Sequence, residues 1–242
     1  RQWWGERVEG IEACIKMCHK KGLKIMLKPQ IWVRGQWIGD LDYKTAAEWT
    51  KWESQYKAYL MSYVKIAIKN DVEMICLGTE IRNSVVKRPQ FWKGLIREIR
   101  QEYKGKLTYS ANWDDYQKIV FWKELDFIGI SSYYPLSASQ TPSVKELISK
   151  WKPVKTELAK YSKKYDKKIL FTEYGYLTVD GCAGKTWELE KNMKTLSKNE
   201  EAQRNAFEAL FSVFWKEDFW AGGFLWKWFP AGMGHEGQPE KD

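Results

Sequence analysis

A repeated alternation of short apolar runs with longer amphipathic stretches constrains the fold of this chain more than any other feature. The longest amphipathic stretch carries Trp49, Trp52 and Tyr56 at helical spacing. A short apolar run reads as a buried parallel strand, and each such strand needs a crossover, usually a helix, before the next one. The pattern therefore predicts an α/β fold. The predicted strands cover residues 23–27, 72–78, 107–111, 126–130, 168–172 and 222–226.

Helices are expected between these strands. A capping box of Thr45 with Glu48 begins the longest one, and Ser143 with Glu146 begins another. A proline inside a helix removes a backbone hydrogen bond and clashes with the preceding turn, so Pro153 is expected to divide that second helix into two pieces. The other predicted helices cover residues 7–21, 89–103 and 200–216.

The number of predicted strands suggests an incomplete (β/α)8 TIM barrel. Six strands are found where a closed barrel has eight. The simplest account is a single catalytic-type domain over residues 1–242 that holds barrel strands three to eight, with the first two strands and the last helix missing from this chain. An open doubly wound sheet is the alternative, but no glycine-rich phosphate loop follows any strand, which disfavours nucleotide binding.

Composition narrows the possible partners. The formal net charge is +9, but the lysines are dispersed, which is typical of a solvated surface rather than of nucleic-acid binding. No apolar run is long enough to span a bilayer. The four cysteines lack metal-site spacing, so we expect neither a metal nor another cofactor. The pattern does not specify an oligomeric state. Fifteen tryptophans are the unusual count, and an exposed tryptophan in a cleft is a surface on which sugar rings stack.

Two glutamates stand at the tips of predicted strands. Glu80 follows the apolar run 72–78, and Glu173 follows the run 168–172. A carboxyl group at the C-terminal end of a barrel strand lies where such barrels place their chemistry. Retaining glycoside hydrolysis needs two carboxyl groups about 5–5.5 Å apart, one to protonate the leaving oxygen and one to attack the anomeric carbon, whereas an inverting enzyme places them roughly 6.5–9.5 Å apart to admit water. The alternative is that both glutamates cap helices or form salt bridges at the rim.

Five motifs, all at predicted strand ends, give a family resemblance. In chain order they are Leu27-Lys28-Pro29, Leu77-Gly78-Thr79-Glu80, Ser110-Ala111-Asn112-Trp113, Asp126 to Ile130 with Tyr133-Tyr134-Pro135-Leu136, and Thr172-Glu173-Tyr174-Gly175. Together, from about Gly10 to Trp228, they resemble glycoside hydrolase family 113, whose members include β-mannanases. The resemblance implies a retaining barrel enzyme with Glu80 on strand four as acid/base and Glu173 on strand seven as nucleophile. Gln30 departs from the histidine expected in the mannanases, which affects the substrate more than the reaction.

Several residues near these motifs are candidates for substrate binding or for support of the catalytic pair. Tyr133 is expected to donate its hydroxyl to Glu173, unless it is a core tyrosine bonded to backbone. Asn112 bonds either a sugar hydroxyl or a catalytic carboxylate, unless it only caps its own loop. Trp226 is the candidate platform under the reacting sugar, with rim packing as the alternative. The remaining substrate-binding candidates are Lys28, Gln30, Trp32 and Trp113, with Trp37 as a further outer-subsite candidate.

Three aspartates fit structural roles better than catalytic ones. Asp126 precedes its strand, on the side of a barrel that serves stability. Asp114 and Asp115 read as loop turns.

These observations predict a retaining glycoside hydrolase that acts on an oligo- or polysaccharide with β-linkages, most similar to an endo-β-1,4-mannanase. The alternatives are a non-catalytic carbohydrate-binding TIM barrel and a related glycosidase for a different β-linked sugar. The resemblance also implies a secreted, periplasmic or cell-surface location.

Overall fold

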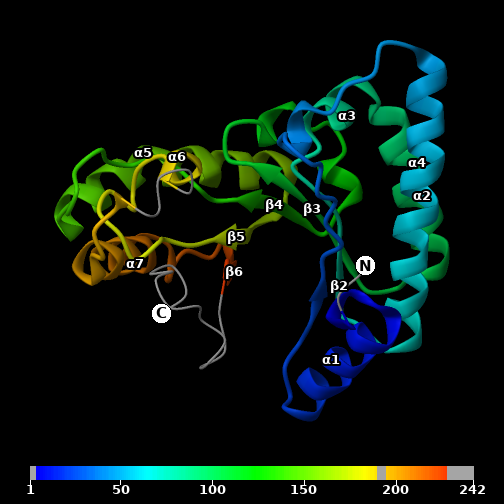
Figure 1. Ribbon diagram of the computed structural model, residues 1–242, viewed down its shortest axis with the longest axis horizontal. Helices are drawn as coiled ribbons and strands as arrows, with labels where there is room; N and C mark the ends of the chain where they lie inside the picture. Colours follow the sequence, from blue (N-terminus) through cyan, green and yellow to red (C-terminus); the bar gives the residue numbers. More distant parts are fainter. Residues whose placement is uncertain (1–3, 190–194, 228–242) are drawn as a thin grey trace. The chain divides into compact units, whose positions relative to one another are not determined.

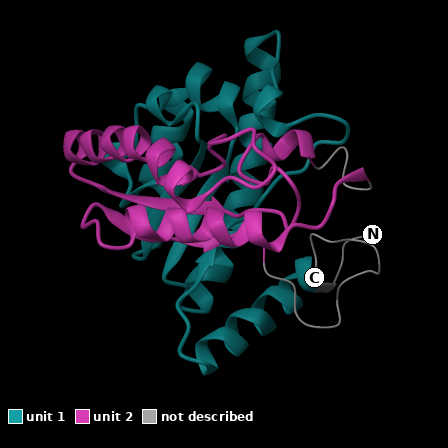
Figure 2. Cartoon of the chain, turned by 90° about the vertical axis from the view of Figure 1, so that its left-hand side faces the viewer, with its two compact units in different colours: residues 1–128 teal, residues 129–242 magenta. Residues whose placement is uncertain are grey.

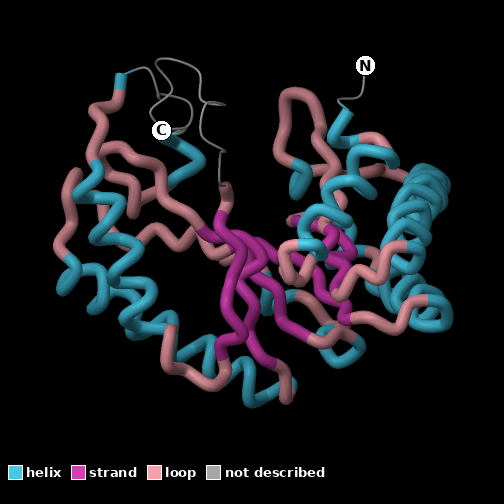
Figure 3. Tube along the Cα trace, turned by 90° about the horizontal axis from the view of Figure 1, so that it is seen from below, coloured by secondary structure: helices cyan, strands magenta, loops and turns pink. Residues whose placement is uncertain are grey.

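The structure, a computed structural model, describes residues 4–189 and 195–227. Its strands are β1 (Met26–Leu27), β2 (Met74–Thr79), β3 (Lys106–Asn112), β4 (Phe127–Ser131), β5 (Lys168–Tyr174) and β6 (Trp220–Leu225). Its α-helices are α1 (Val8–Lys20), α2 (Ala46–Lys69), α3 (Arg82–Lys87), α4 (Pro89–Glu102), α5 (Val144–Tyr165), α6 (Thr186–Leu189) and α7 (Glu200–Phe214). Figure 1 shows the alternation of the two kinds of element along the chain, and Figure 3 separates them by colour.

The sheet topology is that of an α/β protein, as the sequence predicts. The hydrogen-bonded order is β1-β2-β3-β4-β5-β6, the order of the sequence. Strand β2 pairs in parallel with β1 and with β3, and β5 pairs in parallel with β6. The chain divides into two compact units, residues 1–128 and 129–242, coloured separately in Figure 2. The prediction of a single domain over the whole chain stays a prediction.

In the first unit, aromatic side chains fix the strand that leads to Glu80. Helices α2 and α4 lie side by side and present Tyr56 and Trp92 to β2 (Figure 1). The Tyr56 hydroxyl donates a 2.6 Å hydrogen bond to the Leu77 carbonyl oxygen. A Cβ at Gly78 would lie 2.6 Å from that hydroxyl oxygen and 3.0 Å from the Trp92 ring. Glycine is therefore required here because the helices approach the strand this closely.

The long helix of this unit begins where the sequence predicts. The Thr45 side chain accepts a hydrogen bond from the Glu48 backbone N–H, and the Glu48 carboxylate accepts one from the Thr45 N–H, so the capping box is complete. The apolar stripe of Trp49, Trp52 and Tyr56 is buried. In the second half of the helix the buried positions are Leu60, Val64 and Ile66, whereas Tyr59 and Tyr63, which continue the predicted stripe, are only half-buried.

At the start of β4, Asp126 ties neighbouring elements together. Its carboxylate accepts a 2.8 Å hydrogen bond from the Leu107 N–H. It also forms ion pairs with Arg100 at 2.5 Å and with Lys106 at 3.3 Å. Burial alone would raise the pKa of this carboxyl, but Arg100, the Leu107 N–H and Lys106 outweigh it and hold the pKa below the ordinary 3.8. These contacts agree with the structural role expected for Asp126.

In the second unit, α5 and α7 pack together over an aromatic cluster. Phe214 of α7 meets Trp151 of α5 at 5.2 Å and Phe171 of β5 at 5.1 Å between ring centroids. The division of α5 at Pro153 predicted from the sequence is wrong, because the helix runs unbroken from Val144 to Tyr165. Trp151 and Leu158 are fully buried on either side of the proline. Their packing offsets the roughly 3 kcal/mol that a proline costs inside a helix.

The observed elements differ from the sequence prediction most clearly in one short strand and one additional helix. Strand β1 has only two residues, Met26 and Leu27, whereas the apolar run predicts five. Helix α3 was not expected, since its six residues are too few to show a helical period. None of the helices within residues 4–189 and 195–227 is both long and apolar enough to cross a membrane.

Candidate functional site

Glu80 follows the last residue of β2 in an unusual backbone conformation. Its φ is +55°, in the left-handed region that residues other than glycine seldom occupy. Its backbone N–H donates a 2.7 Å hydrogen bond to the Ser110 carbonyl oxygen of β3, and the residue is half-buried. Such a conformation costs about 1–3 kcal/mol and occurs preferentially where function requires a side chain to be aimed. Asp71 and Asp166 share this conformation, so the positive φ at Glu80 fits a functional position without assigning a function by itself.

An indole group holds the Glu80 carboxylate. Trp37, in the loop before the short 3-10 helix Ile38–Asp40, donates its Nε1–H to Glu80 Oε2 over 2.7 Å. A Cβ at Gly39 would overlap the Trp37 ring, so glycine lets the ring pack directly on the backbone. Trp37 contacts the candidate acid/base, and its expected place at an outer subsite stays a prediction.

A cation–π contact and two ion pairs lie behind this indole. The Arg82 guanidinium carbon lies 4.6 Å from the centroid of the Trp37 ring. Arg82 Nε donates to Asp115 Oδ2 over 2.6 Å, and Nη2 contacts Asp114 Oδ1. Asp115 is only 3% exposed. Burial raises the pKa of its carboxyl above the ordinary value, while Arg82 opposes that rise.

Glu173 lies within β5, near its end, and is 6% exposed. The Tyr133 hydroxyl, two residues beyond β4, donates to Glu173 Oε2 over 3.0 Å. The Ser132 N–H donates to the Glu173 carbonyl oxygen over 2.7 Å. The hydrogen bond expected from the sequence between Tyr133 and Glu173 is therefore present. A buried carboxylate with a phenol donor is fixed in one orientation and has its charge stabilised.

The candidate substrate-binding residues have varied surroundings. Trp226 follows β6, is 36% exposed, and has Lys227 Nζ 5.5 Å from its ring centroid. Trp32 is 81% exposed, whereas Lys28 and Trp113 are half-buried. The Asn112 amide donates to Asp114 Oδ1 over 3.0 Å, which matches the loop-capping alternative. Roles in substrate binding stay predictions for all five.

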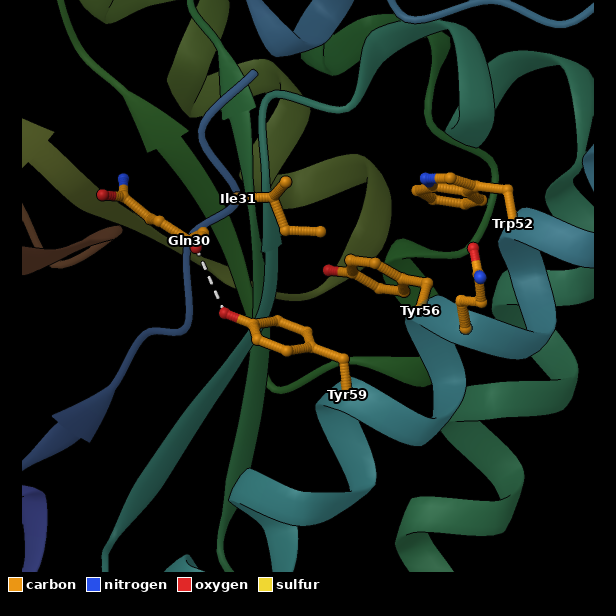
Figure 4. Close-up of a pocket in the computed structure, with 6 residues that line it drawn as sticks. Gln30, Ile31, Trp52, Tyr56 and Tyr59 are labelled. Atoms are coloured by element: carbon orange, nitrogen blue, oxygen red, sulfur yellow. Dashed lines mark hydrogen bonds between the residues drawn. The ribbon is translucent and has the colours of Figure 1, made fainter. Parts of the chain in front are cut away.

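Gln30 lines a shallow hollow against α2, drawn in Figure 4. The hollow has a volume of about 390 Å³ and is walled mainly by Trp52, Tyr56 and Tyr59. The Tyr59 hydroxyl donates to the Gln30 carbonyl oxygen over 3.1 Å, and the Gln30 side chain points away from the helix (Figure 4). The helix thus anchors the Gln30 backbone and leaves its amide directed elsewhere.

Within the described part of the chain, no group of three or more His, Cys, Asp or Glu side chains is placed to hold a metal ion. What these residues offer chemically is two carboxyl groups at strand ends, each with its own neutral hydrogen-bond donor.

The comparison with family models decides the identity. The model of Glycoside Hydrolase Family 113 matches residues 6–242. The chain belongs to glycoside hydrolase family 113. The resemblance seen in the motifs is therefore confirmed, although its last residue, Trp228, lies outside the described residues.

Solved structures of family 113 agree with this assignment. The β-mannanase AaManA from Alicyclobacillus acidocaldarius, solved in complex with ManMIm, is 25% identical, with 92% of this chain and 69% of that chain covered and a TM-score of 0.80. Another family 113 β-1,4-mannanase, solved as a complex, is 27% identical over 90% of this chain and 68% of that chain, with a TM-score of 0.74. This glycoside hydrolase therefore has the TIM-barrel type of fold that the sequence predicts.

More distant structures share only the fold. A β-glucuronidase from Ruminococcus gnavus is 16% identical, with 95% of this chain and 38% of that chain covered and a TM-score of 0.67. No curated protein matches this chain.

Sequence reasoning did not single out Arg82, which lies over the ring that donates to Glu80. The available signal was a basic residue two positions after Glu80, with an acidic pair, Asp114-Asp115, just after the next strand. Residues that follow neighbouring parallel strands lie at the same sheet edge, so an ion pair was a reasonable expectation. Both aspartates lie in a turn, as expected from the sequence, and they are also ion-pair partners of that arginine.

Proposed function

We propose that this family 113 glycoside hydrolase is a retaining, β-mannanase-like enzyme that cleaves within a β-1,4-linked polysaccharide. Family membership and the mannanase structures at 25% and 27% identity support a substrate of this class. The observation that carries the mechanism is the 3.0 Å hydrogen bond from Tyr133 to the buried carboxylate of Glu173. A carboxylate held in one orientation by a neutral donor suits attack on an anomeric carbon.

In the first step of this proposal, Glu173 attacks the anomeric carbon and forms a glycosyl ester. Glu80, protonated, transfers its proton to the glycosidic oxygen as that oxygen leaves. The developing positive charge at the sugar ring is stabilised by the anionic carboxylate before the bond forms. Tyr133 donates to Oε2 of Glu173 and so holds the carboxylate in one orientation.

In the second step, water hydrolyses the glycosyl ester. Glu80, now ionised, takes a proton from the water as it attacks the same carbon from the face that the leaving group vacated. Two inversions give net retention. The indole N–H of Trp37 favours the ionised form of Glu80 that this step requires, because it donates to the charged carboxylate.

The sugar-binding part of the proposal rests on exposed aromatic rings. Trp226 provides the platform for the reacting sugar and Trp32, 81% exposed, a surface for a more distant unit of the chain. A mannose ring is recognised by hydroxyl geometry as well as by stacking, and Gln30 offers an amide that both donates and accepts.

The test is product analysis with the purified chain. Incubation with mannan, cello-, xylo- and manno-oligosaccharides should give cleavage confined to, or fastest on, the β-1,4-mannosyl substrates. Proton NMR in the first minutes should show the β-anomer as the initial product, since retention preserves the configuration. An initial α-anomer contradicts the double displacement. Preference for another β-linked sugar contradicts the mannan specificity, and binding without cleavage indicates a carbohydrate-binding barrel instead.

We also propose that the enzyme acts outside the cytoplasm, where polymeric mannan is found. Degradation of a polymer too large to enter the cell requires an exported enzyme. Immunodetection in culture medium, periplasm and cytoplasm of the source cells tests this, and an exclusively cytoplasmic signal contradicts it.

A further inference from the structure

We propose that Arg82 is a positioning residue for Glu80, and that it acts through the ring of Trp37. The stacked guanidinium fixes the indole so that its N–H stays on the Glu80 carboxylate through both proton transfers. This inference rests on the proposed acid/base role of Glu80.

The contact chain is short and each link has its own geometry. Glu80 Oε2 accepts from Trp37 Nε1 at 2.7 Å, and the Trp37 ring lies under the Arg82 guanidinium at 4.6 Å. A cation over an indole is attracted by the negative face of the ring, more strongly where water is excluded. Trp37 is half-buried and belongs to a loop, so this contact helps to determine where its ring lies.

Arg82 is held firmly enough to act as such a support. Its Nε and Nη2 contact Asp115 and Asp114, and the Asn112 amide donates to Asp114 over 3.0 Å. A guanidinium that forms in-plane hydrogen bonds through its edge leaves its flat face available for stacking. The acidic pair after β3 thus orients the arginine, and the arginine orients the indole.

The charge balance around Arg82 explains why Arg82 influences Glu80 through the Trp37 ring rather than through its own electrostatic field. Arg82 is paired with two aspartates, so its positive charge is more than compensated where it stands. A compensated guanidinium alters the proton affinity of a neighbouring group much less than an unpaired one. Its planar geometry, which a lysine lacks, is the property that the indole uses.

A purely structural reading competes with this one. The ion pair between Arg82 and Asp115 also connects the segment after β2 with the segment after β3. If that is its whole role, substitution lowers stability and affects all substrates alike. A positioning role predicts instead that the loss depends on how much the leaving group needs a proton.

The experiment compares Trp37→Phe, Arg82→Lys and Arg88→Lys in the 242-residue chain. The first keeps a ring but removes the N–H, and the second keeps the charge but removes the planar face. The third is the matched control, because Arg88 pairs with Glu53 at 2.6 Å in the same unit and the carboxylate it pairs with is not a candidate catalytic group. Circular dichroism and thermal unfolding establish that each variant is folded.

The readout is kcat/KM, which reports the glycosylation step, on two manno-oligosaccharide glycosides. One carries a dinitrophenyl leaving group, which needs no proton, and the other an alkyl alcohol, which does. We expect Trp37→Phe and Arg82→Lys to lose about 10- to 100-fold on the alkyl glycoside, within the range that general acid catalysis supplies. We expect less than about threefold loss on the dinitrophenyl glycoside. Arg88→Lys should stay within about threefold of the parent on both, because Arg88 pairs with Glu53 rather than with either candidate catalytic glutamate.

The pH profile gives a second readout that a structural role would not move. Removal of the indole N–H should shift the basic limb of the kcat/KM profile for the alkyl glycoside to higher pH, because the ionised carboxylate loses a donor. Equal losses on both glycosides, or Arg82→Lys no different from Arg88→Lys, overturn the inference. A separate variant, Glu80→Gln, tests the acid/base role on which the inference rests. If its loss of kcat/KM does not depend on the leaving group, the acid/base assignment itself fails.

Discussion

The two strand-end glutamates are held in opposite ways. Glu173 lies inside β5, is 6% exposed, and receives its hydrogen bond from Tyr133, two residues past β4. Glu80 lies just past β2 with a φ of +55°, is half-buried, and receives its hydrogen bond from a loop residue 43 positions earlier in the chain. One carboxylate is positioned by the sheet, and the other by loops and side-chain stacking.

The difference matches the two proposed roles. A nucleophile keeps one charge state and one direction of attack, so a rigid, buried strand serves it well. An acid/base must exchange a proton with a leaving group and then with water, so it needs access and a partner that tolerates both protonation states. The comparison teaches that the same residue type at equivalent strand ends acquires its role from what surrounds it.

The largest effect is expected from removal of either carboxyl group, and its pattern tests the comparison directly. Glu173→Ala should lower kcat on the order of 10⁵-fold on every substrate, the scale seen when a nucleophile is removed from a covalent mechanism. Glu80→Ala should lower kcat/KM about 10²- to 10⁴-fold only where the leaving group needs protonation, whereas kcat should fall on the dinitrophenyl glycoside as well, because hydrolysis of the glycosyl ester loses its general base. Added azide should restore turnover of the dinitrophenyl glycoside in Glu80→Ala as a β-glycosyl azide. If the two variants show the reverse patterns, the roles are exchanged.

A smaller effect is expected at the partner of the buried carboxylate. Tyr133→Phe removes one hydrogen bond to Glu173, and such a bond to a charged group contributes about 1.5–3 kcal/mol. We expect a roughly 10- to 100-fold decrease in kcat/KM that is the same for good and poor leaving groups. Trp37→Phe is the matched variant at the other glutamate, where the loss should depend on the leaving group. Similar behaviour of the two variants would remove the distinction drawn between the sites.

A change at the opposite, strand-start end separates stability from catalysis. Asp126→Asn should lower the free energy of unfolding by about 1–2 kcal/mol at pH 7, with allowance for partial exposure. Because the folded-state pKa of Asp126 lies below the ordinary 3.8, its contribution is fully present above that value and is lost as the pH falls through the folded-state pKa. Thermal unfolding of both proteins from pH 7 down to pH 2 should therefore show the difference shrinking. The pH–rate profile of Asp126→Asn should match that of the parent. A shifted profile would show that this distant carboxylate also affects the catalytic pair.

The smallest effect concerns the backbone of Glu80. Asparagine tolerates the left-handed region better than other non-glycine residues, so Glu80→Asn should be more stable than Glu80→Gln by up to about 1 kcal/mol. At Glu173 the same pair of substitutions should show no advantage for asparagine, since no positive φ occurs there. Chemical denaturation of the four inactive variants measures both differences. Equal stability of Glu80→Asn and Glu80→Gln would show that the conformation carries no strain.

The sequence by itself determined the alternation of strands and helices, the capping box at Thr45, the family, and both glutamates with Tyr133 beside one of them. These are short-range signals: hydrophobic period, local capping chemistry and residues next to strand ends. Apart from the hydrogen bond between Tyr133 and Glu173, which spans 40 positions and was expected from the motifs, each depends on residues a few positions apart.

Only the tertiary structure decided how α5 passes Pro153 unbroken, that Glu80 has a left-handed backbone, and that Trp37 and Arg82 stand behind it. The burial of Trp151 and Leu158 outweighs the cost of a proline inside the helix, and no short sequence pattern predicts this burial. A hydrogen bond between residues 43 positions apart forms because folding brings a loop and a strand end together. Contacts of that kind depend on three-dimensional packing, which the order of residues along the chain encodes only through the complete fold.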